Sequence, residues 1–154
     1  MAAPRPLRVA TVLRVERPAP AVLRLVLGGP GVAGLDVGEH SDHYVKLLLT
    51  PPGVTHPEPW DLATIRASRP QPEWPVPRSY TVRGYRDGEL TLDLVGHGDT
   101  GHGAGLAVSW AAQARPGDQV HLQGPGGDWA PDPGAAWHLL VADGSALPAV
   151  AVSL

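Results

Sequence analysis

Residues 78–95 read RSYTVRGYRDGELTLDLV, and this stretch decides the fold. Two runs rich in β-branched, aromatic and aliphatic residues, 78–85 and 89–95, flank a turn that contains Asp87 and Gly88. An Asp-Gly pair between two such runs is typical of a tight β-hairpin, because both residues readily adopt positive φ. The stretch therefore predicts two antiparallel strands joined by a short turn.

The rest of the chain repeats this pattern of short apolar runs separated by Gly and Pro. Further strands are predicted at residues 8–16, 22–27, 43–49 and 119–123, and one complete helix is predicted at residues 105–114. Six strands with a helix before the last one predict an all-β fold, a six-stranded antiparallel Greek-key barrel. Closure into a barrel is favoured because it leaves no exposed strand edge.

Two segments lie outside this barrel pattern. Residues 51–76 form a long polar connection, and loops of this length usually bind something or move, so a lid or a mobile insertion is expected. Residues 137–142 (WHLLVA) predict one more strand, followed by the start of a helix. The expected organisation is a barrel over residues 1–134 and the beginning of a second domain over residues 135–154.

The composition excludes several classes of function. A net charge of -3 without any Lys/Arg cluster leaves no basic field for nucleic acid. The absence of Cys removes disulfides, thiolate nucleophiles and Cys-ligated metals, and His40, Asp42 and His43 are too small a cluster to predict a metal site. No run reaches the roughly 18 apolar residues of a membrane span. With no signal-peptide pattern at the start, a cytoplasmic protein without a membrane partner is expected.

The first strand of the hairpin carries the residues best suited to a ligand. Side chains alternate along a strand, so Arg78 and Tyr80 share one face while Ser79, Thr81 and Arg83 share the other. A guanidinium suits a phosphate, an aromatic ring suits a planar ligand, and a hydroxyl suits a ring heteroatom. These residue types predict a flavin nucleotide site, and the alternative is an ordinary exposed strand.

A glycine-rich segment, residues 96–105 (GHGDTGHGAG), connects the hairpin to the predicted helix. Backbone N–H groups and the positive end of a helix dipole make such a turn a natural phosphate cradle. The candidate cofactor contacts in it are His97, Gly98, Gly101 and Gly103. The alternative is a flexible connector capped by one of its polar side chains.

Five segments, in chain order, carry a family resemblance: 43–50 (HYVKLLLT), 78–83 (RSYTVR), 93–98 (DLVGHG), 115–127 (RPGDQVHLQGPGG) and 141–150 (VADGSALPAV). They resemble siderophore-interacting proteins and related ferric-siderophore reductases over nearly the whole chain. The resemblance implies a ferredoxin-reductase-type barrel that binds FAD. It also implies that Arg78 binds the flavin phosphates, Tyr80 packs on the isoalloxazine ring, and Thr81 bonds near its reactive nitrogen. His97 with Gly98 would hold the ribityl or phosphate region.

Three departures from the family bear on function. Family members continue into an α/β domain that binds NAD(P)H, of which only residues 137–142 and the start of a helix are expected here, so a separate protein would donate electrons. Residues 101–106 replace the family's Gly-Pro-Ala element at the helix start, which puts the phosphate contact in question. Asp143-Gly144 stands where an acidic pair is expected, and the family's basic siderophore contacts have no counterpart.

These departures leave a second function open. The barrel could enclose an apolar small molecule without any cofactor, as a cyclase or isomerase of natural-product biosynthesis. Tyr44, Trp60, Tyr80 and Trp110 would then line its interior and restrict the substrate's conformation. A non-catalytic interaction domain is the third alternative.

Overall fold

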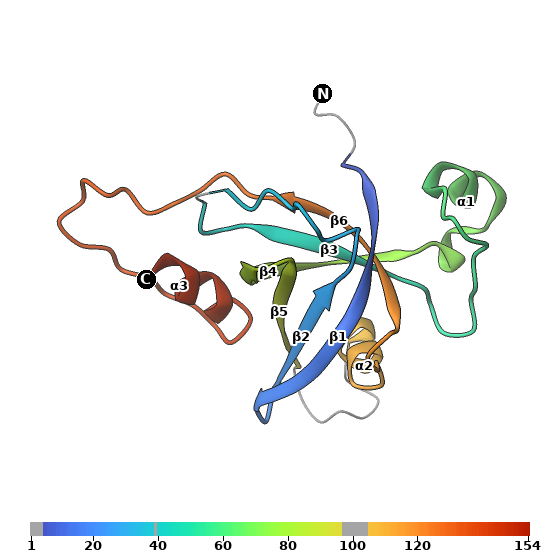
Figure 1. Cartoon of the computed structure of the whole chain (residues 1–154), viewed down its shortest axis with the longest axis horizontal. Coiled ribbons are helices and arrows are strands. Elements are labelled where there is room, and N and C mark those ends of the chain that lie inside the picture. Colours follow the sequence, from blue (N-terminus) through green and yellow to red (C-terminus); the bar gives the residue numbers. More distant parts are fainter. Residues whose placement is uncertain (1–4, 39, 97–104) are drawn as a thin grey trace.

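A closed antiparallel barrel forms the centre of the computed structural model, which describes residues 5–38, 40–96 and 105–154 (Figure 1). Its strands are β1 (Leu7–Ala19), β2 (Val22–Gly28), β3 (Tyr44–Leu49), β4 (Val76–Arg86), β5 (Glu89–Val95) and β6 (Gln119–Gly126). Around the barrel they follow the order β1-β2-β5-β4-β3-β6, and all neighbours are antiparallel. The predicted six-stranded barrel is confirmed.

The hairpin of β4 and β5 forms as the sequence predicts. Asp87 and Gly88 have φ values of 54° and 78°, and Arg86 pairs with Glu89 across the turn. Positive φ at both turn residues gives the chain the twist that the flanking strands need. The turn chemistry therefore fixes the register of this hairpin.

Aliphatic side chains fill the barrel interior. The largest fully buried side chains are Leu25, Leu27, Leu47, Leu90, Leu92, Leu94, Leu122, Val12, Val26, Val32 and Val45. Because a small barrel is filled by its inward side chains, no room is left for an aromatic-lined bore. The predicted interior pocket of Tyr44, Trp60, Tyr80 and Trp110 is therefore wrong; Tyr80 and Trp110 are only partly buried and pack against this core from its edge.

The helix prediction was incomplete. Helix α2 (Leu106–Ala111) lies within the predicted range and α3 (Leu147–Ser153) follows residues 137–142, where the start of a helix was expected, but α1 (Leu62–Ser68) and the 3-10 turn η1 (Gln71–Glu73) were not predicted. Asp61 caps α1, since its carboxylate accepts hydrogen bonds from the Ala63 N–H at 2.9 Å and the Thr64 hydroxyl at 2.7 Å. None of the helices in the described part of the chain is long and apolar enough to cross a membrane.

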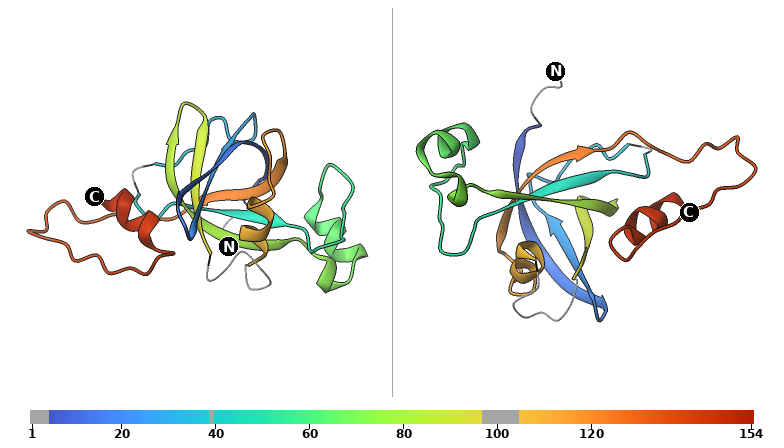
Figure 2. Two further views of the ribbon diagram at one scale, coloured as in Figure 1. Left: turned by 90° about the horizontal axis from the view of Figure 1, so that it is seen from below. Right: turned by 180° about the vertical axis from the view of Figure 1, so that it is seen from behind.

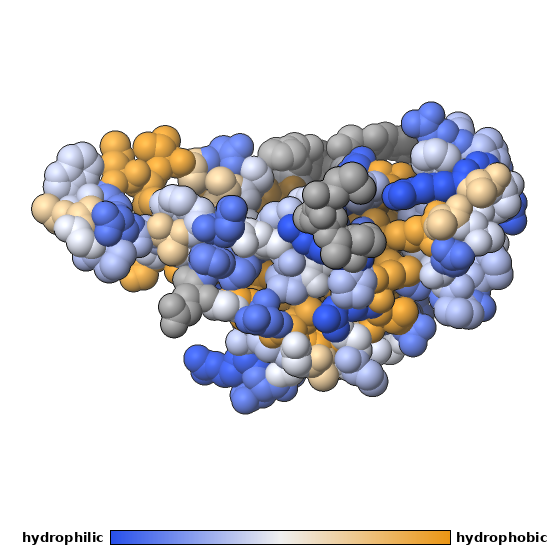
Figure 3. Space-filling view, turned by 90° about the horizontal axis from the view of Figure 1, so that it is seen from above, coloured by the Kyte–Doolittle hydropathy of each residue, from blue (hydrophilic) through white to orange (hydrophobic). Residues whose placement is uncertain are grey.

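The expected strand at residues 137–142 does not form. Trp137, Leu139 and Val141 are 76%, 75% and 86% exposed, and no described strand pairs with this segment. An apolar run becomes a strand only where a neighbour accepts and donates its backbone hydrogen bonds. Figure 3 shows hydrophobic side chains at the end of the molecule that this segment forms.

Helix α2 lies against the barrel, and the other helices lie at two opposite ends of the molecule. Helix α1 is at one end, and α3 with the long connection that precedes it is at the other, in both views of Figure 2. Residues 51–76, expected to be a lid or a mobile insertion, contain α1 and η1 and end at the first residue of β4.

Candidate functional site

The ladder between β4 and β5 opens partway along its length. From the turn it joins the strands as far as Val82 and Leu92, with Arg83 as an extra residue in β4, a β-bulge. Beyond this point residues 76–81 pair only with β3, and residues 93–95 pair only with β2. The two strands therefore separate, and a cleft opens between them.

This cleft has a volume of about 440 Å³. Its lining residues are Arg78, Ser79, Tyr80 and Thr81 from β4, Asp93 and Val95 from β5, Gly105, Ala107 and Val108 around the start of α2, and Ser145 before α3. Four of the five candidate residues of β4 thus share one hollow. Asp93, Val95, Ser145 and the start of α2 were not predicted as site residues, although Asp93, Val95 and Ser145 lie in segments that carried the family resemblance.

The polar side chains of β4 in the cleft have few partners within the protein. Arg78 donates from Nη1 to the carbonyl oxygen of the adjacent Pro77 at 2.9 Å, and none of the ion pairs among described residues involves it. The hydroxyls of Ser79 and Thr81 have no hydrogen-bond partner in the described part of the chain. A guanidinium and two hydroxyls are therefore available to a polar ligand.

Tyr80 supplies the aromatic surface of the cleft. It is half-buried, it packs against the barrel core, and its backbone pairs with Val45 of β3. Burial raises the pKa of the Tyr80 hydroxyl above its ordinary value, and the positive charge of Arg78 offsets part of this rise. The phenol is therefore neutral at physiological pH, and the ring offers a flat face beside a cation.

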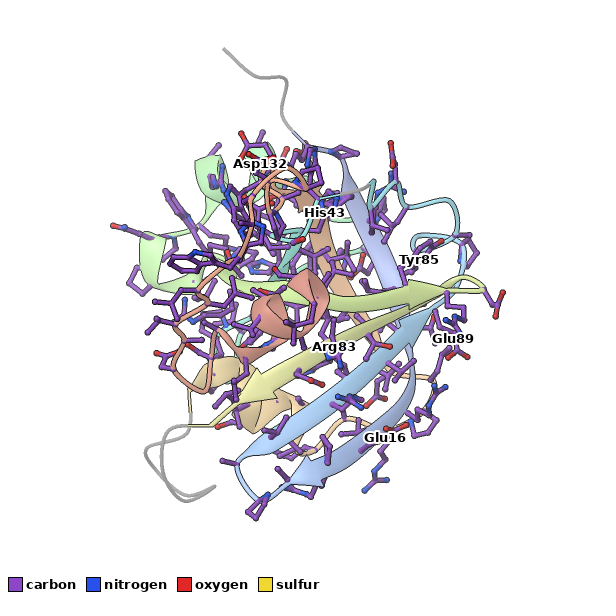
Figure 4. The ribbon with its side chains drawn as sticks, turned by 90° about the vertical axis from the view of Figure 1, so that its left-hand side faces the viewer. Glu16, His43, Arg83, Tyr85, Glu89 and Asp132 are labelled. Carbon is purple, nitrogen blue, oxygen red and sulfur yellow. The ribbon has the colours of Figure 1, made fainter. Side chains whose placement is uncertain are left out.

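Asp93 is the acidic side chain of this lining. Its oxygens accept hydrogen bonds from Nε and Nη2 of Arg24 at 2.7 and 2.9 Å, and Nε of Arg83 lies 4.0 Å from Oδ2. Arg83, a predicted cofactor contact, does not itself line the cleft. It lies beside β5 near α3 (Figure 4) and lines a smaller neighbouring hollow, which shares Asp93 and Val95 with the cleft.

The remaining predicted cofactor contacts belong to the glycine-rich segment. They are His97, Gly98, Gly101 and Gly103, and they lie outside the described residues. The described lining residues on either side of them in the chain are Val95 and Gly105. The glycine-rich segment, residues 96–105, thus follows one lining residue of the cleft and ends at another.

The four aromatic residues of the alternative function do not share a pocket. The Tyr44 hydroxyl accepts a hydrogen bond from Arg5 at 2.9 Å. Trp60 stacks on His121, with 3.7 Å between ring centroids and 8° between planes. Of the four, Tyr80 is the one that lines the cleft.

A family comparison agrees with the cleft. Residues 11–129 match the family described as the Siderophore-interacting FAD-binding domain. The match spans every strand except the first residues of β1, and it includes the β4 and β5 residues that line the cleft. The chain therefore belongs to this family, as the sequence motifs indicated.

Individual relatives extend the similarity over nearly the whole chain. An uncharacterized protein of Mycobacterium tuberculosis is 39% identical over 155 residues, which cover 97% of this chain and 53% of that protein. The NADPH-dependent ferric-chelate reductase of Escherichia coli is 33% identical over 144 residues, covering 93% and 54%. A siderophore utilization protein from T. fusca has a similar crystal structure, with a TM-score of 0.73, 32% identity and coverage of 97% and 56%.

These relatives bear on the function of the chain and on how much of a related protein it covers. The chain spans about half the length of each of them. The Escherichia coli relative is a ferric-chelate reductase and the T. fusca protein is a siderophore utilization protein, and together with the family match they do not support the alternative of a cyclase in natural-product biosynthesis. The class is a flavin-binding domain that resembles ferric-siderophore reductases.

Proposed function

We propose that this chain binds FAD in the cleft between β4 and β5 and acts as the flavin-binding half of a ferric-chelate reductase. The observation that carries the proposal is the cleft itself, in which Arg78, Ser79 and Thr81 have polar groups free for a ligand next to the Tyr80 ring. Protein side chains normally satisfy their polar groups with other protein groups or water, so such a concentration is typical of a binding site.

Each side chain has a role that suits the parts of FAD. Arg78 would bind a phosphate with its fork of donors, and Tyr80 would pack against the isoalloxazine ring. The hydroxyl of Thr81 would hydrogen-bond to a ring heteroatom, and Ser79 would bond to a neighbouring polar atom. When bound, FAD would supply the chemistry that protein side chains lack, accepting two electrons and delivering them singly to ferric iron.

A nicotinamide nucleotide is the electron source that fits the relatives, since one of them is an NADPH-dependent ferric-chelate reductase. We propose that residues 1–134 form the flavin domain and residues 135–154 the beginning of a nicotinamide-binding domain, completed by further chain or by a separate donor protein. The exposed Trp137, Leu139 and Val141 support this division, because a neighbouring sheet would bury them.

Titration of purified protein with FAD tests the proposal. We expect quenching of flavin fluorescence, a shifted flavin absorbance band and a micromolar or lower Kd. Thr81→Val removes one hydroxyl from the cleft with little change of shape, and we expect binding to weaken about tenfold, or about 1.4 kcal/mol. Thr91→Val is the matched control, since Thr91 lies on β5 in a different hollow, and it should leave the Kd unchanged.

Two results would overturn the proposal. One is a protein whose presence changes neither the fluorescence nor the absorbance of added FAD or FMN. The other is flavin binding that Thr91→Val weakens as much as Thr81→Val does, because the ligand would then not distinguish the cleft from the rest of the barrel wall.

A further inference from the structure

A cluster of three charged side chains, Arg24 of β2, Arg83 of β4 and Asp93 of β5, lies beside the cleft, and Asp93 is the member that lines it. Arg24 and Asp93 are direct cross-strand partners, and the guanidinium holds the carboxylate with two bonds of 2.7 and 2.9 Å. The Asp93 side chain is only 11% exposed. Arg83, the extra residue of the bulge, approaches the same carboxylate to 4.0 Å without making a hydrogen bond.

We infer that Asp93, fixed by Arg24, is a positioning residue that holds Arg83 beside the cleft as a second cation for the bound flavin. This inference rests on the proposed function and adds to it a residue outside the lining of the cleft. Two guanidinium groups and one carboxylate leave the cluster with one net positive charge. The cluster therefore attracts an anion, although the group that reaches the cleft surface is an acid.

The bulge explains why Arg83 needs a positioning partner. As the extra residue of β4 it stands opposite no residue of β5, so the ladder does not fix its direction. Among described residues it makes no hydrogen bond, and its donors remain free for a ligand. The attraction of Asp93 is the interaction that draws its long side chain toward the cleft.

Partial burial strengthens this attraction. Arg24, Arg83 and Asp93 also line the neighbouring hollow of about 200 Å³, whose other walls are mostly apolar and include Leu147 and Pro148 of α3. The side chains of Arg24 and Arg83 are 29% and 38% exposed. Charges in such surroundings interact more strongly than fully solvated charges do, because less water screens them.

The direction in which Asp93→Asn changes the affinity for FAD distinguishes this inference from a purely electrostatic effect of Asp93. If Asp93 were only a negative charge near an anionic ligand, Asp93→Asn would tighten FAD binding. If Asp93 positions Arg83, the same substitution releases the cation, and we expect binding to weaken about tenfold in a fluorescence titration. The midpoint potential of the bound flavin should also fall, because the reduced flavin carries negative charge and would lose a nearby cation.

Glu89→Gln is the matched control. Glu89 is also a β5 carboxylate paired with an arginine, Arg14, at 2.9 Å, but it lies away from Arg83 (Figure 4). We expect less than about a twofold change in Kd from it. Arg24→Lys keeps the charge but cannot make both hydrogen bonds to Asp93, so it should weaken FAD binding a few-fold. This variant tests the inference independently of whether Asp93→Asn folds.

A double-mutant cycle completes the test. In an Arg83→Gln background, Asp93→Asn and Arg24→Lys should change the Kd by less than about twofold, because the residue they position is gone. Equal or tighter FAD binding by Asp93→Asn, or effects that persist without Arg83, would overturn the inference while flavin binding by the unaltered protein still stood. Failure of the unaltered protein to bind FAD would instead overturn the proposed function itself.

Discussion

Two faces of the barrel differ in how far other parts of the protein cover them. On the face formed by β3 and β6, Trp60 stacks on His121 at 3.7 Å, and Leu48 and Ile65 are each only 5% exposed. On the face where β4 separates from β5, Arg78 and its neighbouring hydroxyls have few or no partners among the described residues.

The ladder accounts for the difference. Between β3 and β6 the strands stay paired, with Leu48 opposite His121, and the segment that leads into α1 supplies Trp60, whose ring covers His121. Between β4 and β5 the pairing stops at Val82 and Leu92, and a cleft remains. A covered face stabilises the fold, whereas an open one with free donors is suited to a ligand. The two faces should therefore respond differently to substitution.

Arg78→Gln should have the largest effect on ligand binding. Loss of charge-assisted bonds to a phosphate is expected to weaken FAD binding roughly 30-fold, or about 2 kcal/mol, in a fluorescence titration. Arg66→Gln is the control on the covered side, where Arg66 lies over the Trp74 ring. If both substitutions weaken binding equally, general positive charge and not the cleft determines affinity.

Trp60→Ala should lower the stability of the protein without changing its affinity for FAD. Removing a half-buried ring that stacks on His121 is expected to lower the free energy of unfolding by about 1.5 kcal/mol in urea denaturation, less than for a fully buried Trp. The Kd for FAD should stay the same. Trp137→Ala serves as a control, because a side chain that is 76% exposed contributes little to stability. A large change in FAD affinity would mean that the faces are coupled.

The smallest expected effect is a pH dependence on the covered face. Burial lowers the pKa of His121 below its ordinary value of 6.5, and Glu58 opposes this shift. The unfolded chain therefore takes up a proton as the pH falls below 6.5 while the folded protein resists it, so stability decreases toward acid.

His121→Phe isolates this contribution, since it keeps an aromatic ring beneath Trp60 and removes the titrating group. Urea denaturation at about pH 7.5 and about pH 5.5 should show a smaller acid loss of stability for this variant than for the unaltered protein. His138→Phe, at an exposed position, should not reduce the loss. An equal loss in all three proteins would contradict the assignment to His121.

Local chemistry made the strands and part of the site predictable. The Asp87-Gly88 turn fixed one hairpin, and alternating apolar residues located the six strands. Arg78 through Thr81 were predicted from residue type and from the family resemblance, and all four line the cleft. Asp61 is a local helix-cap signal for α1 within the long polar connection, where no helix was predicted.

The features of the fold and the site that could not be predicted depend on contacts between residues far apart in the sequence. That β4 leaves β5 after one extra residue, Arg83, depends on pairing with β3, which no local pattern encodes. The grip of Arg24 on Asp93 joins positions 69 residues apart. Residues 137–142 have a good strand composition and still form none, because strand formation also needs a neighbouring strand.

Where β4 and β5 part, each strand keeps a backbone edge turned toward the cleft that no ladder partner occupies. Amide and carbonyl groups on such an edge can hydrogen-bond along the rim of a flat heterocycle, much as they would to another strand. A purely hydrocarbon guest would leave them unsatisfied and would be disfavoured. The main chain would thus contribute to a preference for rings with a polar edge, and substitution of side chains would not remove that contribution.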